Sequence, residues 1–564
     1  MPTGIKNVWT IDFETNNSDE AIENGETFVW LWDLCSIVTY KHHTGRTIEG
    51  LFSFLKNNFK SHTIFYSHNL KFDGSFILYY LIKSGYKYSP VEQTKLNSGE
   101  FTAIIDARKV YYRISVKVNG VLFEFRDSAK KIPQKVEEIA KSWGLPILKG
   151  CIDYKENHTR GEMPTEEEVA YIHNDTEIVA RVLNEMYKDG LNKLTASADT
   201  LASYKKCIGE DLFDKLFPVL DVEDDDFIRK SYNGGVCYVN PDFKEKELHN
   251  VNCYDVNSMY PSVMHDSLLP YGRPKKRYGL PTEEELKIYP LFIINVHVCM
   301  RVKEDHFPSI MTKGFGFIFK NEYITDTKNE MIDLTLTNVD LDLMIKHYDI
   351  FDIEYGECYM FKGSTNLFKK YIDPIYKIKC ESTGAKKQLA KLKLNSLYGK
   401  FASNPQRKNI EPYIDENGYL SFKILDVYMV DTIYTALSTF ITAYARHKLF
   451  TAIELNHRIF VYCDTDSIHT IGDAVGIEID KSKLGAWDKE KEYELFKVLA
   501  QKTYYGVLKN SKKIIKIAGC PENVKQLISY EDFKFGSTFD GKLRPVLVEG
   551  GTVLVSTSFT IKER

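Results

Sequence analysis

The stretch Tyr462-Cys463-Asp464-Thr465-Asp466-Ser467 decides how this chain is interpreted. An apolar strand runs into two carboxylates, Asp464 and Asp466, which stand two positions apart. Carboxylate oxygens at a strand end are ligands for hard divalent cations, and a pair of such cations can bridge a phosphate group. The stretch therefore predicts a site for phosphoryl chemistry, which other carboxylates of the chain should complete.

The length and composition of the chain fit a globular protein of several domains. At 564 residues we expect about three or four domains of ~150 residues each. The net charge of −4 means that any binding of nucleic acid must come from local basic patches. The ten cysteines form no C-x-x-C pair and no zinc-type Cys/His spacing, which indicates a reducing compartment. The longest uncharged apolar stretch, 432–445, is too short to span a bilayer. We therefore expect a cytoplasmic protein without a membrane segment.

The first part of the chain, residues 7 to about 195, predicts an α/β domain. Thr165 and Glu168 form a capping box that opens a helix with apolar residues at helical spacing. The other elements expected here are strands at 8–13 and 63–67 and a helix at 72–84.

The remainder of the chain alternates between helical and β-rich segments. The acidic run 223–226 is most simply a solvated turn. The other expectations are short strands and turns at 281–361, a helical hairpin at 370–402 that turns near 382–384, a β-hairpin at 410–424 and a β-rich end at 530–562.

Three pairs of polar residues occur in the N-terminal α/β domain. Asp12 and Glu14 alternate along a strand and share one face, and Tyr171 and Asp175 share one face of a helix. Asn69 and Asp73 stand four positions apart at a strand-to-helix junction. Carboxylates that converge in this way repel one another unless they bind cations. Two Mg²⁺ or Mn²⁺ ions would satisfy them, one activating water and one stabilising a leaving 3′ oxygen, while Tyr171 orients the water. The alternative is that each pair is a solvated surface feature.

These pairs, with three later motifs, resemble those of proofreading family B DNA polymerases. The exonuclease motifs D-x-E, N-x-x-x-D and Y-x-x-x-D are similar to Asp12/Glu14, Asn69/Asp73 and Tyr171/Asp175. Polymerase motifs A, B and C resemble Asp255-Val256-Asn257-Ser258-Met259-Tyr260-Pro261, the segment from Lys391 to Gly399, and the opening stretch 462–467.

Two further motifs narrow the resemblance to one subgroup. Tyr232-Asn233-Gly234-Gly235 is similar to a Y-x-G-G linker, and Lys502-Thr503-Tyr504 to a K-x-Y primer-binding motif. With the short length, these features resemble the protein-primed, strand-displacing DNA polymerases of small linear-genome phages of the Bacillus-phage type. Asn233 departs from the Arg-like residue of that subgroup.

The resemblance implies a multidomain α/β and α+β fold. A ribonuclease H-like 3′→5′ exonuclease domain (1–195) would precede a right-hand polymerase domain (196–564). The expected parts of the second domain are palm (about 196–281 and 433–525), a first insertion that contacts the priming protein (about 282–360), fingers (about 361–401), a second insertion (about 402–432) and thumb (about 526–564).

The resemblance also implies roles at the polymerase site. Asp255 and Asp466 would hold two Mg²⁺ or Mn²⁺ ions, supported by Asp464 and the Val256 carbonyl. Tyr260 would lie beneath the incoming sugar and exclude a 2′-OH, and Tyr398 would stack on the nascent base pair.

A basic segment lies close to motif B. Residues 369–408 hold eleven Lys and Arg against two acids. Lys387, Lys391, Asn395 and Tyr398 fall on one helical stripe, which favours a triphosphate clamp that includes Lys379. The alternative is a solvated charged helix.

Several DNA ligands and partners rest on the resemblance. His68, Asn69, Phe72 and Ser128 would hold a frayed 3′ end, with Lys149 as the catalytic lysine. Lys502 and Tyr504 would hold the primer, and Tyr232, Gly234 and Gly235 would border the template. The implied partners of a monomer in the host cytoplasm are template-primer DNA, dNTPs, a terminal protein and a phage single-stranded DNA-binding protein.

Rival interpretations remain open from the residues alone. One is an exonuclease whose C-terminal region binds nucleic acid without catalysis, but Asp255, Asp464 and Asp466 are all present. Another is a non-catalytic single-strand-binding protein, which would not need two carboxylate clusters. An RNA polymerase is disfavoured by Tyr260.

Overall fold

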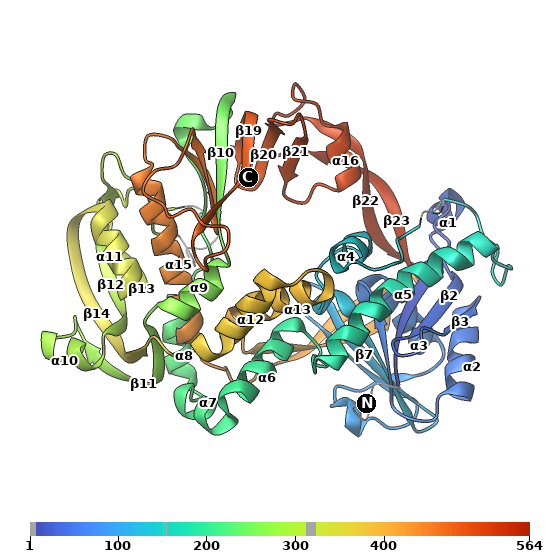
Figure 1. The fold of residues 1–564 in the computed structure, drawn as a ribbon. Coiled ribbons are helices and arrows are strands. Elements are labelled where there is room, and N and C mark those ends of the chain that lie inside the picture. Colours follow the sequence, from blue (N-terminus) through green and yellow to red (C-terminus); the bar gives the residue numbers. More distant parts are fainter. Residues whose placement is uncertain (1–6, 151, 153–154, 312–322, 564) are drawn as a thin grey trace.

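The computed structural model describes residues 7–150, 152, 155–311 and 323–563 (Figure 1). Five sheets and the helices around them form an N-terminal α/β unit and a larger unit that faces it. Among the helices of these residues, none combines the length and apolarity that crossing a bilayer requires.

An eight-stranded sheet forms the centre of the N-terminal unit. At its middle, β1 (Val8–Thr15), β4 (Thr63–Ser67) and β8 (Val121–Asp127) are parallel. The sheet is completed by β2 (Val29–Ser36) and β3 (His42–Gly45) on one side and by β7 (Tyr111–Val118), β6 (Glu100–Ile105) and β5 (Lys87–Tyr88) on the other. Along β1, Ile11 and Phe13 enter one apolar core and Val8 another, because side chains alternate between the faces of a strand.

Helices cover both faces of this sheet. One core includes apolar residues of α2 (Ile48–Asn58) and α3 (Leu70–Lys83), and the other includes those of α4 (Val136–Trp143) and α5 (Glu166–Lys188). The predicted capping box of Thr165 and Glu168 opens α5, and α3 begins two residues before its predicted start. The expected α/β fold of this unit is confirmed.

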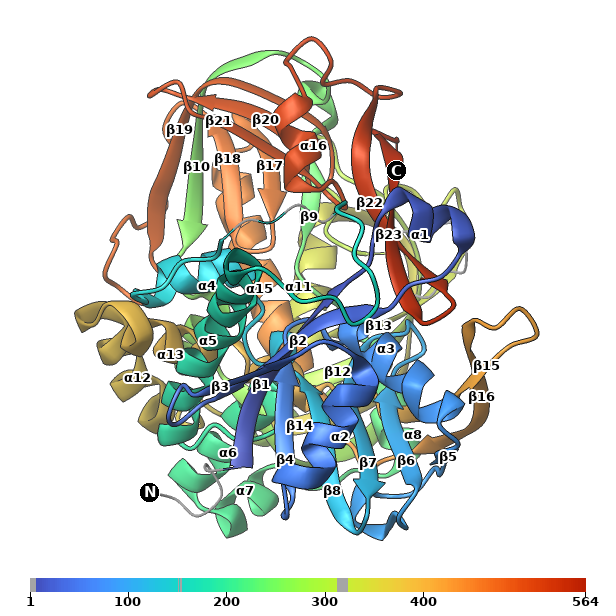
Figure 2. The same ribbon diagram turned by 90° about the vertical axis from the view of Figure 1, so that its right-hand side faces the viewer.

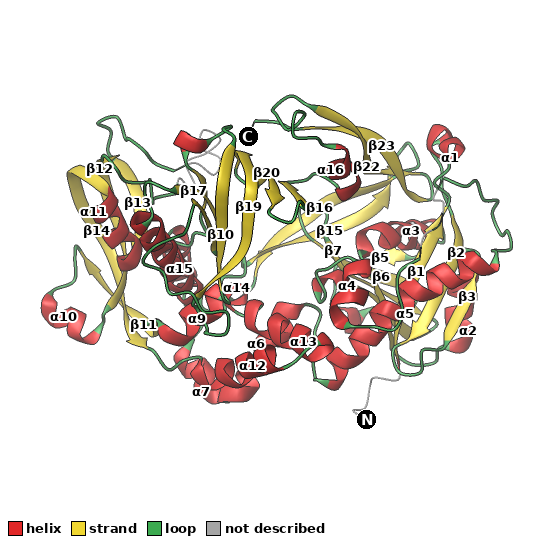
Figure 3. Ribbon diagram, turned by 45° about the horizontal axis from the view of Figure 1, so that its top comes forward, coloured by secondary structure: helices red, strands yellow, loops and turns green. Residues whose placement is uncertain are grey.

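A seven-stranded sheet organises the larger unit (Figure 3). Its order is β21 (Lys513–Ile517), β20 (Thr503–Leu508), β19 (Trp487–Ala500), β10 (Leu248–Val256), β18 (Ser467–Ile471), β17 (Phe460–Asp464) and β9 (Cys237–Val239). The long helix α15 (Thr435–Leu455), which is buried over most of its length, packs against it with α9 (Met259–Asp266) and α8 (Val222–Lys230).

The described part of residues 269–364, which leaves out 312–322, forms a third sheet and two helices. The strand order is β11 (Leu269–Tyr278), β14 (Tyr348–Ser364), β12 (Leu291–Val302) and β13 (Ile332–Thr337). The helices are α10 (Glu283–Ile288) and α11 (Asn338–His347). The prediction of short strands and turns was wrong for β12 and β14, which are long, and it missed α11. Alternation along β12 is obscured because Phe292, Ile293 and Ile294 are all buried on its two faces.

The predicted helical hairpin is present as α12 (Lys369–Glu381) and α13 (Gly384–Asn395). The stripe through Tyr398 is corrected, because α13 ends at Asn395 and Tyr398 begins a separate short helix, α14 (Tyr398–Phe401). The apolar side of α13 packs against the N-terminal unit, where Leu389 and Leu392 adjoin the core that contains Trp143.

The acidic run 223–226 is not the solvated turn that we expected. It lies in α8, and Asp224 and Asp225 are buried. Asp225 pairs with Arg229 and accepts a hydrogen bond from Thr435, while Asp224 accepts one from the Tyr359 hydroxyl. These distant partners stabilise charges that the local sequence alone assigns to solvent.

Two hairpins reach the N-terminal unit from the larger one (Figure 2). Leu420, at the turn end of the hairpin of β15 (Gln406–Ile414) and β16 (Leu420–Met429), is buried in the core that includes α3. In the hairpin of β22 (Thr538–Val548) and β23 (Gly551–Thr560), Thr552 hydrogen bonds to Ser75 of α3. The remaining helices are α1 (Asp19–Asn24), α6 (Ala196–Ile208), α7 (Glu210–Leu216) and α16 (Glu522–Leu527).

Candidate active sites

Strand pairing in the seven-stranded sheet brings the carboxylates of motifs A and C together. Asp255, near the end of β10, lies opposite Ser467 of β18. The Val256 N–H donates to the Asp466 carbonyl at 2.8 Å, which fixes the turn between β17 and β18 against β10. Thr465 in this turn has φ 61°, so the chain reverses sharply between the two aspartates.

Burial and mutual repulsion raise the pKa values of Asp255 and Asp466. The pKa of Asp255 rises to about 7, chiefly by burial and then by the charge of Asp466. That of Asp466 rises to about 6, again chiefly by burial, with Asp464 and Glu490 contributing. Buried like charges without a cation are costly, so this donor set fits oxygen-ligated divalent metal ions.

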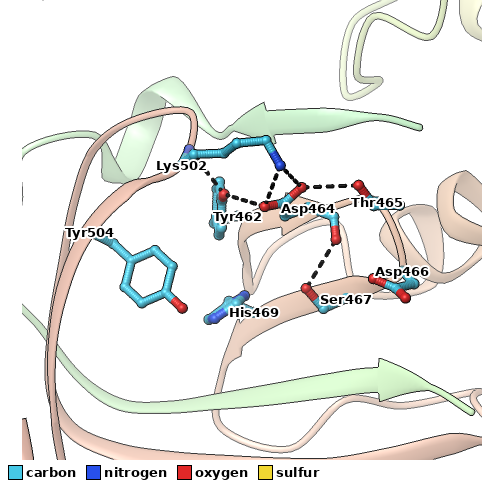
Figure 4. A pocket seen from close by; sticks show the side chains of 8 residues that line it. All are labelled: Tyr462, Asp464, Thr465, Asp466, Ser467, His469, Lys502 and Tyr504. Atoms are coloured by element: carbon cyan, nitrogen blue, oxygen red, sulfur yellow. Dashed lines mark hydrogen bonds and ion pairs between the residues drawn. The ribbon is translucent and has the colours of Figure 1, made fainter. Parts of the chain in front are cut away.

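Asp464 has a different environment from Asp466 (Figure 4). The Lys502 ammonium donates to both carboxylate oxygens of Asp464, at 2.6 and 2.8 Å, and Thr465 donates to one of them at 3.1 Å. A cavity of about 340 Å³ lies beside this pair and is also lined by Asp466, Ser467, Tyr462, His469 and Tyr504. Asp464 is therefore engaged by a cation of the protein, whereas Asp466 points away from Lys502.

The two tyrosines of motifs A and B stack on each other next to the aspartates. The Tyr260 and Tyr398 rings have centroids 4.0 Å apart and an interplanar angle of 20°. The linker packs against them closely, since a Cβ on Gly235 would lie 2.9 Å from Thr465 Cγ2 and 3.1 Å from the Tyr260 hydroxyl. Gly234 has open space instead, and Tyr232 is half-buried nearby.

The predicted lysines of the helical hairpin gather near motif A. Lys379 Nζ donates to Ser258 Oγ at 2.7 Å. Burial lowers the pKa of Lys379, and the positive charges of Lys391 and Lys387 lower it further. Lys391 and Asn395 are exposed on α13. The hairpin thus presents a cluster of lysines on the side of Asp255.

All four predicted carboxylates of the N-terminal unit border one cavity of about 350 Å³. Asp12 and Glu14 come from β1, Asp73 from the first turn of α3, and Asp175 from α5. Tyr171 lies one turn before Asp175 and is buried beside them.

As at the first site, burial raises the pKa values of carboxylates that border this cavity. Burial and the neighbouring carboxylates raise the pKa of Glu14 to about 8, and that of Asp12 rises well above its usual range for the same reasons. The pKa of Asp73 rises to about 7, chiefly through burial, although Ser67 donates to its carboxylate. One oxygen each of Asp73 and Asp175 is buried with no hydrogen-bond partner among the described residues. Divalent cations would supply the missing partners.

Lys149, His68, Asn69 and Phe72 also line this cavity. Lys149 Nζ donates to Asp175 at 2.5 Å and lies 5.1 Å from the centre of the Tyr171 ring. Ser128 is fully buried and its hydroxyl contacts His68 Nδ1 at 2.9 Å and donates to the Ser67 carbonyl. It therefore orients His68 and does not border the cavity itself.

The structure adds residues that the motifs do not reveal. Glu490 and Asp488 of β19 add negative charge beside Asp255, and Leu554 of β23 closes the cavity of the N-terminal unit. Arg446 of α15 pairs with Asp340 of α11 and donates to the carbonyls of the linker residues 233 and 234. These partners lie far apart in the chain, so no local signal identifies them.

Comparisons with known proteins identify the family of this chain. Residues 56–165 and 155–474 match the family described as DNA polymerase type B, organellar and viral. The chain is 38% identical to the DNA polymerase of Bacillus phage phi29 over 587 aligned positions, which cover 99% of each chain. It is 40% identical to that of Bacillus phage Nf, covering 88% of this chain and 90% of the relative, and 33% identical to that of Streptococcus phage Cp-1, covering 98% of each.

A solved structure with the same fold is that of phi29 DNA polymerase complexed with primer-template DNA and incoming nucleotide substrates. It superposes with a TM-score of 0.91 at 37% sequence identity, covering 98% of this chain and all of that one.

Proposed function

Because the chain belongs to the type B DNA polymerases of organelles and viruses, we propose that its two carboxylate sites perform opposite reactions on one DNA 3′ end. The chain is a DNA-directed DNA polymerase of the protein-primed phage type. The site of Asp255 and Asp466 extends the primer, and the site of Asp12, Glu14, Asp73 and Asp175 removes its last nucleotide. The observation that carries this proposal is the presence of two separate clusters of buried carboxylates with raised pKa values.

Metal ions complete both sites in this proposal. Family B DNA polymerases use divalent metal ions. We infer Mg²⁺ or Mn²⁺, two per site, because the donor sets contain only oxygen. Asp255, Asp466 and the Val256 carbonyl would hold them at one site and the four N-terminal carboxylates at the other. When bound, they activate the attacking oxygen and neutralise charge on the leaving group.

At the synthesis site the side chains bind and orient the substrates. Lys379, Lys387 and Lys391 attract the triphosphate, and Asn395 lies on the same helical stripe. Tyr260 stacks on Tyr398 and fills the space beneath the incoming sugar. Lys502 holds Asp464 in place, and with Tyr504 it faces the primer strand across the cavity. Tyr232, Gly234 and Gly235 border the template.

At the editing site the side chains hold a single-stranded 3′ end. Asn69 and Phe72 border the cavity beside His68, which Ser128 orients. Lys149, which donates a hydrogen bond to Asp175, neutralises phosphate charge, and the buried Tyr171 orients the attacking water. The alternative of an exonuclease with an inactive C-terminal region is not favoured by the comparisons.

The partners follow from the relatives. Template-primer DNA and dNTPs are the substrates, as the structures of phi29 DNA polymerase with primer-template DNA and incoming nucleotides suggest. We propose that synthesis begins on the hydroxyl of a terminal protein, that a phage single-stranded DNA-binding protein covers the displaced strand, and that a monomer acts in the host cytoplasm. We retain the domain division at 195/196 and the palm, finger, thumb and insertion ranges given above as proposals.

The test is an end-labelled primer on a longer template with Mg²⁺, with and without dNTPs. We expect extension with dNTPs and shortening without them. Asp466→Ala should abolish only extension, and Asp12→Ala/Glu14→Ala should abolish only shortening. Shortening under both conditions by the unaltered chain would refute the synthesis function.

A further inference from the structure

A third group of metal-ligating side chains lies outside both active sites. Asp33 of β2, His42 of β3 and His173 of α5 place one ligand atom each within 4.8 Å of one another. Asp33 is fully buried and pairs across the sheet with Asp12, so the cluster stands one strand away from the editing carboxylates. Nothing in the proposed function uses these three residues.

A ring nitrogen of each histidine lies near the buried carboxylate, and His173 Nε2 is also hydrogen-bonded to Thr44 Oγ1 at 2.9 Å. His42 Nδ1 lies 2.7 Å from Asp33 Oδ2, and His173 Nε2 lies 3.4 Å from Asp33 Oδ1. Ligand atoms around a tetrahedral zinc ion are separated by about 3.4 Å, given Zn–N and Zn–O distances near 2.1 Å. The His173–Asp33 separation of 3.4 Å equals this value, whereas His42 is hydrogen-bonded to Asp33 at 2.7 Å and must move outward by about 0.7 Å to admit an ion.

The residues around the cluster hold its members in place. Thr176 and Thr44 donate hydrogen bonds to the two oxygens of Asp33, at 2.6 and 3.0 Å. Glu177 lies 3.6 Å from the outer nitrogen of His42, and Arg181 in turn pairs with Glu177. A carboxylate behind a ligating imidazole orients the ring and increases its basicity, as is usual for zinc-binding histidines.

Charge also favours a cation at this place. The His42 and His173 rings stack with centroids 4.0 Å apart, so two protonated rings would repel strongly. The buried Asp33 and the neighbouring Glu177 together carry two negative charges, whereas Arg181 supplies one positive charge at the outer edge. A divalent ion would replace the proton shared by His42 Nδ1 and Asp33 Oδ2, because the same two atoms would then be its ligands.

We propose that Asp33, His42 Nδ1 and His173 Nε2 bind a late first-row divalent cation, foremost zinc, with water as the fourth ligand. Two imidazoles and one carboxylate suit zinc better than the all-oxygen sets of the active sites. The ion would join β2 and β3 to α5, the helix that also carries Tyr171 and Asp175. Its role is therefore to hold α5 against the sheet beside the editing site.

The chain provides matched control residues. His43 follows His42 on β3, but its ring faces Trp9 and Phe54 on the other side of the strand. His158 belongs to a second, more exposed group with Glu156 and Glu168. The tests therefore use the full chain with His42→Gln, His173→Gln, His43→Gln or His158→Gln.

Zinc content is measured by mass spectrometry after removal of metals with a chelator and dialysis against Zn²⁺ with excess Mg²⁺. To exclude zinc held by the catalytic carboxylates, each variant is also made in an Asp12→Ala/Glu14→Ala/Asp255→Ala/Asp466→Ala background. We expect about one zinc per chain in the parent and in the His43 and His158 variants, and at least tenfold weaker binding in the His42 and His173 variants.

Two outcomes would overturn the proposal. One is a parent chain that retains no zinc, and the other is zinc binding that is unchanged by His42→Gln and His173→Gln. Cobalt bound to the parent chain gives a check that needs no variant. A visible spectrum of four- or five-coordinate Co²⁺ supports the site, and a spectrum of six-coordinate Co²⁺ alone contradicts it.

Discussion

Burial gives the carboxylates of both active sites their chemical character. Asp255, Asp466, Glu14 and Asp73 have pKa values of about 6 to 8, far above those of exposed acids. The protein thus places negative charges where they repel one another and are poorly hydrated. Carboxylates at such positions destabilise the folded chain on their own, and bound divalent cations remove this cost.

The same burial acts on His469, which lies on β18 below the polymerase cavity. It is 2% exposed among the rings of Tyr462, Tyr493 and Phe496. Burial, assisted by the charge of Lys491, lowers its pKa to about 3. Because the unfolded chain takes up the proton near pH 6.5, the stability that His469 contributes is complete above pH 6.5 and is lost as the pH falls toward 3.

We predict that His469→Gln weakens the acid dependence of unfolding. The change should amount to about 1.4 kcal/mol per pH unit below pH 6, which is the free energy of one proton. Melting temperatures measured between pH 7 and pH 5 test this, with the exposed His249→Gln as control. Equal acid dependence in both variants would contradict the assigned environment.

In the linker between α8 and β9, Gly235 is packed much more tightly than Gly234. Gly235 touches Thr465 of the motif C turn and the Tyr260 hydroxyl, whereas a side chain at Gly234 meets open space. Arg446 donates a hydrogen bond to the Gly234 carbonyl of the linker and also pairs with Asp340 of α11.

Gly235→Ala should therefore displace the turn that carries Asp464 and Asp466. We expect primer extension to fall by about tenfold or more, because displacements below 1 Å at reacting groups are costly, while shortening of single strands stays unchanged. Single-turnover extension, with Gly234→Ala as the matched control, measures the effect. A Gly235→Ala enzyme as fast as the Gly234→Ala enzyme would show that this contact is not rigid.

The predictability of an element from the sequence depended on where its partners lie. The capping box of Thr165 and Glu168 follows from local spacing and is confirmed, and the helical hairpin expected at 370–402 is present at 369–395. Asp225 was misjudged because Thr435, its partner, lies 210 residues away. The spacing from Lys387 to Tyr398 suggested one continuous helix, but α13 ends at Asn395. Tyr398 therefore stacks on Tyr260 from a separate helix.

Whether a site residue could be predicted also depended on how close its partners lie in the sequence. The carboxylate pairs were found because each lies within five residues on one strand or helix. Glu490, Leu554 and Asp33 were not found, because they reach their sites through strand pairing or hairpin docking between distant segments.

For the whole molecule, the C-terminal hairpin connects the two units. Its strand β23 contacts α3, and the Glu549 carbonyl accepts a hydrogen bond from the Thr27 N–H of the N-terminal unit. Gly550 passes so close to Thr27 that a Cβ there would collide with the Thr27 carbonyl oxygen. The hairpin thus lies between the seven-stranded sheet and the N-terminal unit (Figure 2).

We predict that Gly550→Ala loosens this contact and shortens the DNA made in one binding event. Gly536→Ala is the control, because Gly536 has a similar positive φ (87° against 93°) but open space around it. Product lengths are measured with a DNA trap that prevents rebinding. Equal lengths in both variants would mean that backbone strain, and not the contact with Thr27, causes any effect.

The central claim is that one chain builds and edits the same 3′ end at two separate sites. The most direct measurement gives the protein a primer with a mismatched, labelled 3′ nucleotide, Mg²⁺ and all four dNTPs, and sequences the extended products. We expect corrected products from the parent chain, products that retain the mismatch or stalled primers from Asp12→Ala/Glu14→Ala, and only shortened primers from Asp466→Ala. Corrected products from the Asp12→Ala/Glu14→Ala variant would contradict the account, because editing would then occur without the proposed site.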